Sequence, residues 1–307
     1  MAGNENVNGG SRRPFQGLLP PAAEPLPTLG EIFGPGGRIR VRRLRPGYRL
    51  AVVRDPQRLP PECRDRLLRL LMDGCRNAFG KDLDAYWGHC GSGFFSGLSV
   101  LALAVTDAGD VVGASTARRT DLGDAGLLFL DAAFVVAGHQ DRGLTGHITR
   151  VLIRDHALRC RRYPLYVATR TASPRVYEAL RRAAGPGNTH PAIDRPVPVG
   201  FQRLGADITG WLGWGDTFDP GTMKAIDAYA ALPTADTEDW LPAPYLLAPQ
   251  ARDAAVNAFF ARHLGPRDAF LVIIRLTPGN LALSLARLAR TWATRSGPVR
   301  AAGRVRR

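Results

Sequence analysis

Lysine is almost missing from this sequence of 307 residues, in which Lys81 and Lys224 are the only two. Arginine therefore supplies nearly all of the positive charge, and the formal net charge at pH 7 is +14. An excess of arginine with many alanine, glycine and proline residues is typical of a GC-rich genome. It also favours anionic partners, such as phosphate groups, an acidic protein or RNA.

Cysteine is scarce as well. The four cysteines, Cys63, Cys75, Cys90 and Cys160, have neither the spacing of metal ligands nor the density of a secreted disulfide framework. We therefore expect reduced thiols and no metal site.

Long apolar runs are also missing. No stretch reaches the length of a transmembrane helix, and no apolar signal-peptide segment opens the chain. We therefore expect a cytoplasmic protein without membrane contact. Hydrophobic residues make up 45% of the chain, which is enough for a sizeable core in one large domain or two small ones.

The stretch 126–185 has the clearest pattern. It predicts a strand (127–136), a glycine-bearing turn (137–146), an amphipathic helix (147–160) and a second apolar strand (164–169). Ser173 then suits the N-cap of another helix and Pro174 its first position. This helix carries Tyr177 and ends near Gly185.

The turn 137–146 has the chemistry of an anion site. Gly143 lets the backbone approach a ligand closely, and the amides of 142–146 open a helix. Unpaired N–H groups and the helix dipole attract a pyrophosphate there. The alternative is an ordinary strand-to-helix turn, because a glycine before a helix is a weak signal.

A short motif connects this turn with a known family. Gln140, Gly143 and Thr145 fit the frame Gln/Arg-x-x-Gly-x-Gly/Ala, with Thr145 in place of the last small residue. Val135 and Ala137 stand where Val-x-Pro is usual. In these residues the stretch 48–185 resembles the GNAT superfamily of acyl-CoA-dependent N-acyltransferases. The resemblance implies an α/β (α+β) fold, in which helices flank a mixed central sheet that splays at the glycine loop.

The resemblance also implies a site. Acetyl-CoA or another acyl-CoA would be the co-substrate. The residues implied to bind it are Val135, Gln140, Asp141, Arg142, Gly143, Leu144, Thr145, Gly146 and Ser173. Tyr177 would protonate the leaving thiolate, and Asp131 would take a proton from the amine. The residues leave two other roles open: Tyr177 as a half-buried packing residue, and Asp131 as a structural acid paired with an arginine.

The residues before this unit predict a disordered segment and then more of the core, which spans 38–185. Glycine, proline and asparagine in 1–37 predict disorder with one short helical turn at 29–33. Residues 38–54 predict one or two basic strands, 61–79 an amphipathic helix, and 98–106 with 111–119 a hairpin. The aromatic residues of the loop 80–97 either line an acceptor pocket or anchor the loop in the core. They are Tyr86, Trp87, Phe94 and Phe95, with His89 among them.

Residues 186–285 are interpreted as a C-terminal extension. The proline-rich stretch 186–198 predicts an unpacked connector, 219–230 a helix, 232–249 a loop and 251–264 an amphipathic helix. The apolar run 268–276 predicts a buried last strand of the main sheet. Trp211 and Trp214 fit the core or an interface better than an acceptor pocket. A helix at 281–292 leads into a basic tail, so that 286–307 holds the helix end and this tail.

Three functions are compatible with these observations. The first is an N-acyltransferase, most simply an N-acetyltransferase, which moves an acyl group from acyl-CoA to an amine by direct attack in a ternary complex. The second has the same fold but takes the acyl group from an acidic acyl carrier protein. The third is a non-catalytic protein that binds RNA or another protein, although no aromatic-interleaved RNA motif supports it. No residue pattern names the amine acceptor.

Overall fold

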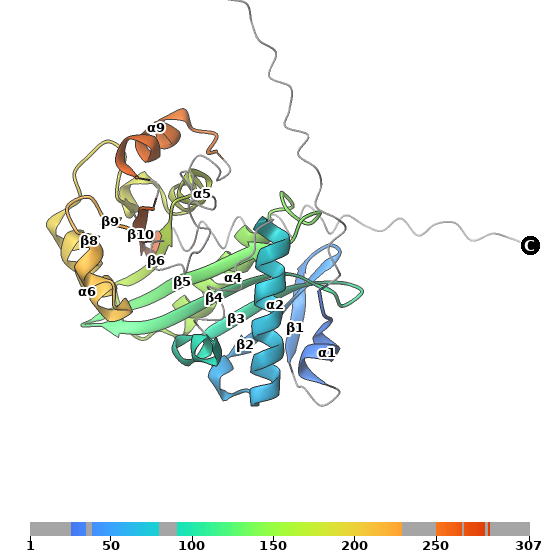
Figure 1. The fold of residues 1–307 in the computed structure, drawn as a ribbon. Coiled ribbons are helices and arrows are strands. Elements are labelled where there is room, and N and C mark those ends of the chain that lie inside the picture. Colours follow the sequence, from blue (N-terminus) through green and yellow to red (C-terminus); the bar gives the residue numbers. More distant parts are fainter. Residues whose placement is uncertain are drawn as a thin grey trace, which may run out of the picture.

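A computed structural model describes residues 26–34, 39–79, 91–228, 250–265, 267–279 and 282. These residues form a ten-stranded mixed sheet in the order β1-β2-β3-β4-β5-β6-β10-β9-β8, and β7 also pairs with β10 (Figure 1). The strands are β1 (Arg40–Arg45), β2 (Tyr48–Arg54), β3 (Val100–Thr106), β4 (Val111–Leu122), β5 (Ala125–Val135), β6 (Leu165–Thr171), β7 (Thr189–His190), β8 (Phe218–Asp219), β9 (Lys224–Ala225) and β10 (Ala269–Leu276). The pair β5–β6 is parallel, and the other pairs among the described residues are antiparallel.

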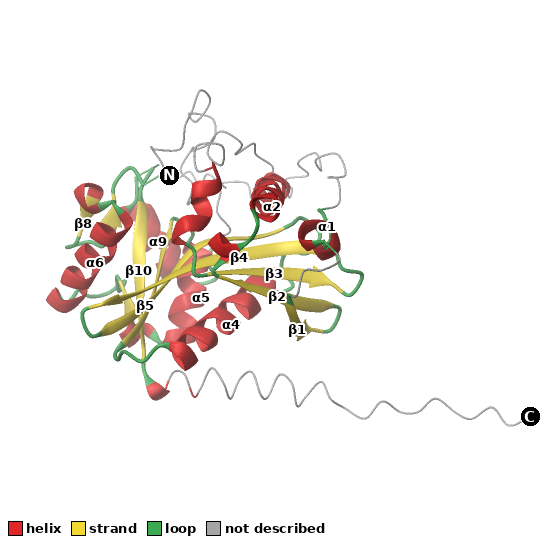
Figure 2. Cartoon of the chain, turned by 90° about the horizontal axis from the view of Figure 1, so that it is seen from below, coloured by secondary structure: helices red, strands yellow, loops and turns green. Residues whose placement is uncertain are grey.

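Helices cover both faces of this sheet (Figure 2). The α-helices are α1 (Leu29–Phe33), α2 (Pro61–Phe79), α4 (Leu144–Arg159), α5 (Pro174–Ala184), α6 (Val199–Leu212) and α9 (Ala254–His263), and the 3₁₀ turns are η1 (Pro56–Arg58), η2 (Gly91–Gly97), η3 (Pro186–Asn188) and η4 (Gly215–Thr217). Figure 2 shows α2 on one side of the sheet and α4 and α5 on the other.

Side-chain alternation along β5 explains how the two faces are covered. Phe129 belongs to an apolar cluster with Ile208 of α6, whereas Leu128 belongs to the cluster that includes Ile148 of α4. Phe134 lies under α2, where a Cβ built on Gly74 would be 2.2 Å from the Phe134 ring. We call the side with α2 and α6 the α2 face, and the opposite side the α4 face.

The central strand β3 is covered on both faces. Its residues from Val100 to Val105 are all buried, which agrees with their nearly unbroken apolar sequence. The predicted hairpin of β3 and β4 is therefore confirmed, as are the two basic strands β1 and β2 and the helix α2. The helix α4 begins at Leu144, earlier than predicted, because the buried Leu144 side chain already belongs to its first turn.

The last strand, β10, confirms the prediction for 268–276. It pairs antiparallel with β6, from Phe270 opposite Thr171 to Leu276 opposite Leu165. Every residue of β10 except Arg275 is buried, because α5 and α9 cover one face and α6 the other.

Two predictions for the C-terminal extension are wrong. The stretch 186–198 is packed rather than open, since Thr189 and His190 form β7 and are buried against β10. Residues 219–230 do not form a helix where the structure describes them, because β8 and β9 make a hairpin there. The Asp219 carboxylate accepts hydrogen bonds from the Gly221 amide (2.9 Å) and the Thr222 hydroxyl (2.5 Å), which stabilises the turn.

Several predictions lie wholly or partly outside the described residues. They concern the loop 80–90 with Tyr86, Trp87 and His89, the loop 232–249, the helix 281–292 apart from residue 282, the basic tail, and the disorder of 1–25 and 35–38. Residues 26–34 are described and ordered: α1, the predicted helical turn, has a capping box at Thr28 and buries Ile32 completely. Phe94 and Phe95 of η2 are buried, so these two aromatic residues anchor the loop in the core.

Candidate functional site

The parallel strands β5 and β6 separate inside the sheet. Their register ends at the pair Leu130–Thr169, although β5 continues to Val135 and β6 to Thr171. At this point Thr169 Oγ1 donates a 2.9 Å hydrogen bond to the Leu130 carbonyl. We call the segments beyond this pair, 131–135 and 170–172, the splay.

A bulge in β5 lies directly at the splay. The β4–β5 register shifts so that Asp131 and Ala132 both stand opposite Thr116. The buried Thr116 hydroxyl accepts a 3.1 Å hydrogen bond from the Ala132 amide, which would otherwise lack a ladder partner. Because a bulge bends its strand, this contact helps to turn β5 away from β6.

The loop after β5 leads into α4 without a side-chain cap. Gly143 is the N-cap residue with a φ of 72°, and Gly138 earlier in the loop has a φ of 78°. No heavy atom lies within 4 Å of a Cβ built on either glycine. The amides of 143–146 donate no hydrogen bond to the part of the chain that the structure describes. Unpaired amides beside open space, at the start of a 16-residue helix, fit a phosphate or pyrophosphate.

The end of α2 holds this loop in place. The Gln140 side-chain amide donates hydrogen bonds to the carbonyls of Ala78 (3.1 Å) and Val135 (3.0 Å). The Asn77 side chain accepts a 2.8 Å hydrogen bond from the Ala137 amide. Gln140 thus shapes the loop through its side chain, and Val135 takes part through its carbonyl. Nothing in the sequence pattern singled out Asn77 for this role.

Arg142 is held in the loop by the Tyr48 hydroxyl, which also contacts His139. Its Nη1 donates to the Tyr48 hydroxyl at 2.8 Å, and this hydroxyl lies 3.0 Å from His139 Nδ1. Burial and then the Arg142 charge lower the pKa of His139, against a smaller opposite effect of Asp110. The imidazole is therefore neutral at pH 7, and its Nδ1 can accept the proton of the Tyr48 hydroxyl. The network keeps the Arg142 guanidinium close to the loop.

The remaining loop residues predicted for the site lie between α4 and α5. Asp141 forms a 2.5 Å ion pair with Arg175 in the first turn of α5, which ties the two helix starts together. Ser173 is the N-cap of α5, as predicted, and its hydroxyl accepts a 3.4 Å hydrogen bond from the Val176 amide. Leu144 is buried, whereas Thr145 and Gly146 are exposed beside Gly143.

Asp131 lies at the mouth of the splay, but it is not alone. Arg118 on β4 donates a 3.0 Å hydrogen bond from Nε to the Asp131 carboxylate, and both side chains remain partly exposed. This is the arginine pairing that the sequence left open as an alternative. The carboxylate keeps lone pairs for a ligand amine, while Arg118 fixes its orientation.

The Tyr177 side chain is engaged in contacts of its own in this structure. Tyr177 is fully buried on the α4 face, where its ring contacts Phe259 and Phe260 of α9. Its hydroxyl donates a 2.7 Å hydrogen bond to the Pro191 carbonyl. This contact agrees with the packing role that the sequence left open for Tyr177, and not with a hydroxyl that faces a thioester. Val176, its neighbour in α5, is exposed.

Two further residues lie at the splay that the sequence pattern did not assign to it. Arg170 follows Thr169 directly, and its guanidinium carbon lies 4.4 Å from the ring centroid of Trp214. The same indole has an edge contact with Phe129, with a centroid distance of 5.6 Å. The signal in the sequence was weak: Arg170 is a charged residue in a largely buried strand.

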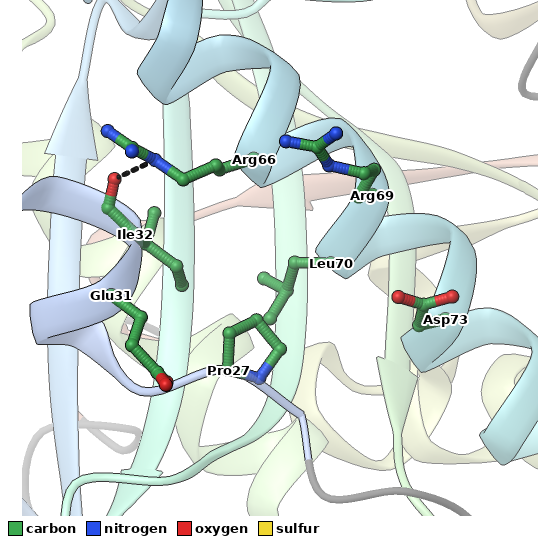
Figure 3. Close-up of a pocket in the computed structure, with 7 residues that line it drawn as sticks. All are labelled: Pro27, Glu31, Ile32, Arg66, Arg69, Leu70 and Asp73. Carbon is green, nitrogen blue, oxygen red and sulfur yellow. Dashed lines mark hydrogen bonds between the residues drawn. The ribbon is translucent and has the colours of Figure 1, made fainter.

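A hollow of about 210 Å³ lies elsewhere, between α1 and α2 (Figure 3). Its lining includes Glu31, Arg66, Arg69 and Asp73. Glu31 already closes the capping box of α1, and Arg66 donates to the Ile32 carbonyl at 2.9 Å. These contacts give the hollow a structural role between the two helices. None of its lining residues belongs to the loop or the splay.

The described residues contain neither a cluster of three potential metal ligands among His, Cys, Asp and Glu nor a helix with the length and apolarity needed to cross a membrane.

Comparisons with known proteins give structural matches only. No family model and no curated protein matches the chain. Among solved structures, an aminoglycoside acetyltransferase from an uncultured soil metagenomic sample is 16% identical, with a TM-score of 0.31, and the match covers 39% of this chain and 78% of that protein. The aminoglycoside N-acetyltransferase AAC(6')-Iy in complex with CoA is 15% identical, with a TM-score of 0.31 and coverage of 48% and 88%.

A GNAT-family N-acetyltransferase from Escherichia coli in complex with CoA is 16% identical, with a TM-score of 0.27 and coverage of 43% and 61%. A likeness at such TM-scores carries no argument about the function of this chain. The fold is visible in the chain itself: a large mixed sheet flanked by helices, with a splay beside an uncapped glycine loop, which is the GNAT-like α/β fold that the sequence predicted.

Proposed function

We propose that this protein is an N-acyltransferase that moves an acyl group, most simply acetyl, from acyl-CoA to an amine. One observation carries the proposal: the parallel strands β5 and β6 separate at the end where α4 begins with unpaired amides and an open glycine N-cap. A splay offers unpaired backbone groups to an extended arm, and the loop offers donors to the pyrophosphate at the end of that arm.

In this proposal the amides of 143–146 and the nearby Arg142 hold the phosphates of acyl-CoA. The backbone of 131–135 pairs with its amide-containing arm in the manner of an added strand. Bound acyl-CoA supplies an activated thioester. Thr145 and Gly146 allow this approach because both are exposed beside Gly143.

The amine approaches from the α2 face, where Asp131 is partly exposed. Asp131 accepts an N–H of the amine and takes up its proton, directly or through a water molecule. A lysine-type amine has a solution pKa of about 10.4, so this deprotonation makes the reaction pH-dependent. No proton donor is required of Tyr177, since a thiol has a pKa of about 8.5 and its thiolate can leave without full protonation.

The free amides also favour acyl-CoA over an acyl carrier protein as donor. A carrier protein presents the same arm without the nucleotide end, so it leaves the loop without its pyrophosphate. Turnover with both donors, measured side by side, decides between them.

Calorimetric titration with acetyl-CoA tests the proposal. Gly143→Val should raise the Kd at least tenfold, because the side chain fills the space beside the free amides. Gly123→Val is the matched control: Gly123 also has a positive φ (58°) and open surroundings, but it lies in the β4–β5 turn at the other end of β5. Both variants carry similar backbone strain. Equal acetyl-CoA affinity in the two variants, or no binding by the unmodified protein at millimolar concentration, would refute the proposal.

A further inference from the structure

We infer that the exposed face of α6 binds the same face of a second copy of this chain, as an antiparallel helix pair about a two-fold axis. The inference goes beyond the proposed function and does not depend on it. It gives α6, a part of the C-terminal extension, a role in association. Figures 1 and 2 both place α6 at one end of the molecule, opposite the end that carries α1, so a second copy can reach it.

The helix α6 has one buried side and one exposed side. It buries Gly205, Ile208 and Thr209 in the protein. At 3.6 residues per turn, the exposed residues fall within an arc of about 140° on the side opposite Gly205. They are Val199, Gly200, Arg203, Ala206, Asp207, Gly210 and Trp211. The two large apolar side chains among them are 60% (Val199) and 37% (Trp211) exposed, which suits a contact surface.

The exposed side chains of α6 are arranged symmetrically about Gly205. Arg203 and Asp207 stand two positions before and after it, and Val199 and Trp211 stand six positions before and after it. In an antiparallel pair whose two-fold axis passes Gly205, each position faces its counterpart in the other copy. Arg203 then faces the partner's Asp207, and Val199 faces the partner's Trp211. The axis produces each of these contacts twice.

The two charges on this face are available for such a contact. Arg203 and Asp207 are four positions apart, a spacing at which an ion pair within one helix can form. Yet neither side chain has a hydrogen bond or an ion pair with the part of the chain that the structure describes. In an antiparallel pair the opposite charges meet, whereas a parallel pair would place like charges together. The charges therefore select the antiparallel arrangement.

Two glycines on the same face have no role within the chain itself. Gly200 and Gly210 have no positive φ, and no heavy atom lies within 4 Å of a Cβ built on either of them. Glycine weakens a helix relative to alanine, so a contact from outside has to explain it. Gly205 differs, because its Cβ would lie 2.8 Å from the Phe218 ring. The partner's Gly210 would face Gly200, and small residues there let the two helices approach to about 8 Å.

The length of α6 limits the strength of this contact. The helix has 14 residues, which corresponds to about 21 Å. A single pair of such helices buries less than the roughly 1,600 Å² of a standard interface. We therefore expect a weak, reversible dimer with a Kd on the order of 1–100 µM.

Sedimentation velocity of the full chain between about 1 and 500 µM tests the inference. The charge reversals Arg203→Glu and Asp207→Arg each place like charges together at both ends of the pair, so each should raise the dimer Kd at least tenfold. An equimolar mixture of the two variants should dimerise again. One variant carries only acids at the two positions and the other only arginines, so every charge in the mixed dimer has a partner. Circular dichroism verifies that both variants are folded.

Arg58→Glu is the matched control. It makes the same reversal at an exposed arginine of η1, which follows β2 and does not belong to α6, and it should leave the dimer Kd unchanged. An unmodified protein that stays monomeric at about 500 µM overturns the inference. A dimer that persists unchanged in both α6 variants overturns it too, because the interface then lies elsewhere. Failure of the mixed variants to associate refutes the pairing of Arg203 with the partner's Asp207.

Discussion

Tyr177→Phe is the most informative single substitution, because it removes one hydroxyl and nothing else. The resemblance to acyl-CoA-dependent transferases implies that this hydroxyl protonates a leaving thiolate. In the structure the hydroxyl is buried and donates to the Pro191 carbonyl at 2.7 Å. We therefore expect Tyr177→Phe to lower stability and to leave turnover nearly unchanged.

The size of the effect follows from the contact. The Pro191 carbonyl is buried with its proline, and removal of the donor leaves this acceptor unpaired. An unpaired buried polar group costs about 1–3 kcal/mol, so the free energy of unfolding should fall by that amount. The ring itself stays, and its contacts with Phe259 and Phe260 are kept.

Alkaline pH provides a second measure of the same contact. Burial raises the pKa of Tyr177 to about 12, whereas an exposed tyrosine has a pKa of about 10. The folded state holds the proton more tightly, so this contribution to stability is complete below pH 10 and is lost as the pH rises through 12. At pH 11 the unmodified protein should have lost about 1.4 kcal/mol through this residue, and Tyr177→Phe should not show that loss.

Urea denaturation at pH 7.5 and pH 11 measures both effects, and steady-state kinetics with acetyl-CoA measures turnover. Tyr166→Phe is the matched control, since Tyr166 is partly buried on β6 and its hydroxyl makes no hydrogen bond within the described residues. Unchanged stability together with a turnover roughly 10²-fold lower would contradict this reasoning and return Tyr177 to the role of a general acid.

Three further predictions concern stability. Gly126→Ala should lower the free energy of unfolding by about 1–3 kcal/mol in urea denaturation, because its Cβ would lie 2.1 Å from Cys160 Sγ. His156 is buried, and burial followed by the Arg119 charge lowers its pKa to about 4. Because the unfolded state, with a pKa of about 6.5, takes up its proton first, the free energy of unfolding should fall by about 3 kcal/mol between pH 7 and pH 4. His156→Phe should flatten this decline. Burial opposes ionisation of Asp155, but hydrogen bonds from Arg119, Arg159 and Arg54 outweigh it and lower the Asp155 pKa. The stability that the Asp155 carboxylate contributes is therefore present above the unfolded pKa of about 3.9 and is lost as the pH falls below it. Asp155→Asn should lower the free energy of unfolding at pH 7 and remove part of the acid-induced unfolding that circular dichroism measures.

Periodicity and helix caps predicted the elements of the core because the relevant physics is local. Ser173 and Pro174 marked the start of α5, and the apolar run of β10 required cover on both faces, as the structure shows. The β8–β9 hairpin was missed because its strands are too short for any periodicity, and only the hydrogen bonds of Asp219 define its turn. Proline in 186–198 suggested an open connector, but β10 offers partners to Thr189 and His190.

The candidate site could be predicted only in part. Gly143 was identifiable because a positive φ at a helix start calls for glycine. The partners of Asp131 and Arg170 could not be found in this way, because Arg118 and Trp214 are brought to them by strand register and by α6. The orientation of Tyr177 depends on α9, which begins 77 positions later in the chain at Ala254. Local patterns contain no information about such distant contacts.

The position of β10 has a consequence for how the protein folds. Its hydrogen-bonding partner β6 ends at Thr171, and β10 begins at Ala269, so nearly a hundred residues must be looped out before this pair can form. Contacts of such high sequence separation slow folding, because the loop-closure entropy is lost before the pair contributes. Until then the edge of β6 is unpaired and open to other strands. During synthesis the central sheet therefore stays incomplete until most of the chain has been made, which makes nascent and C-terminally truncated chains the forms most prone to aggregation.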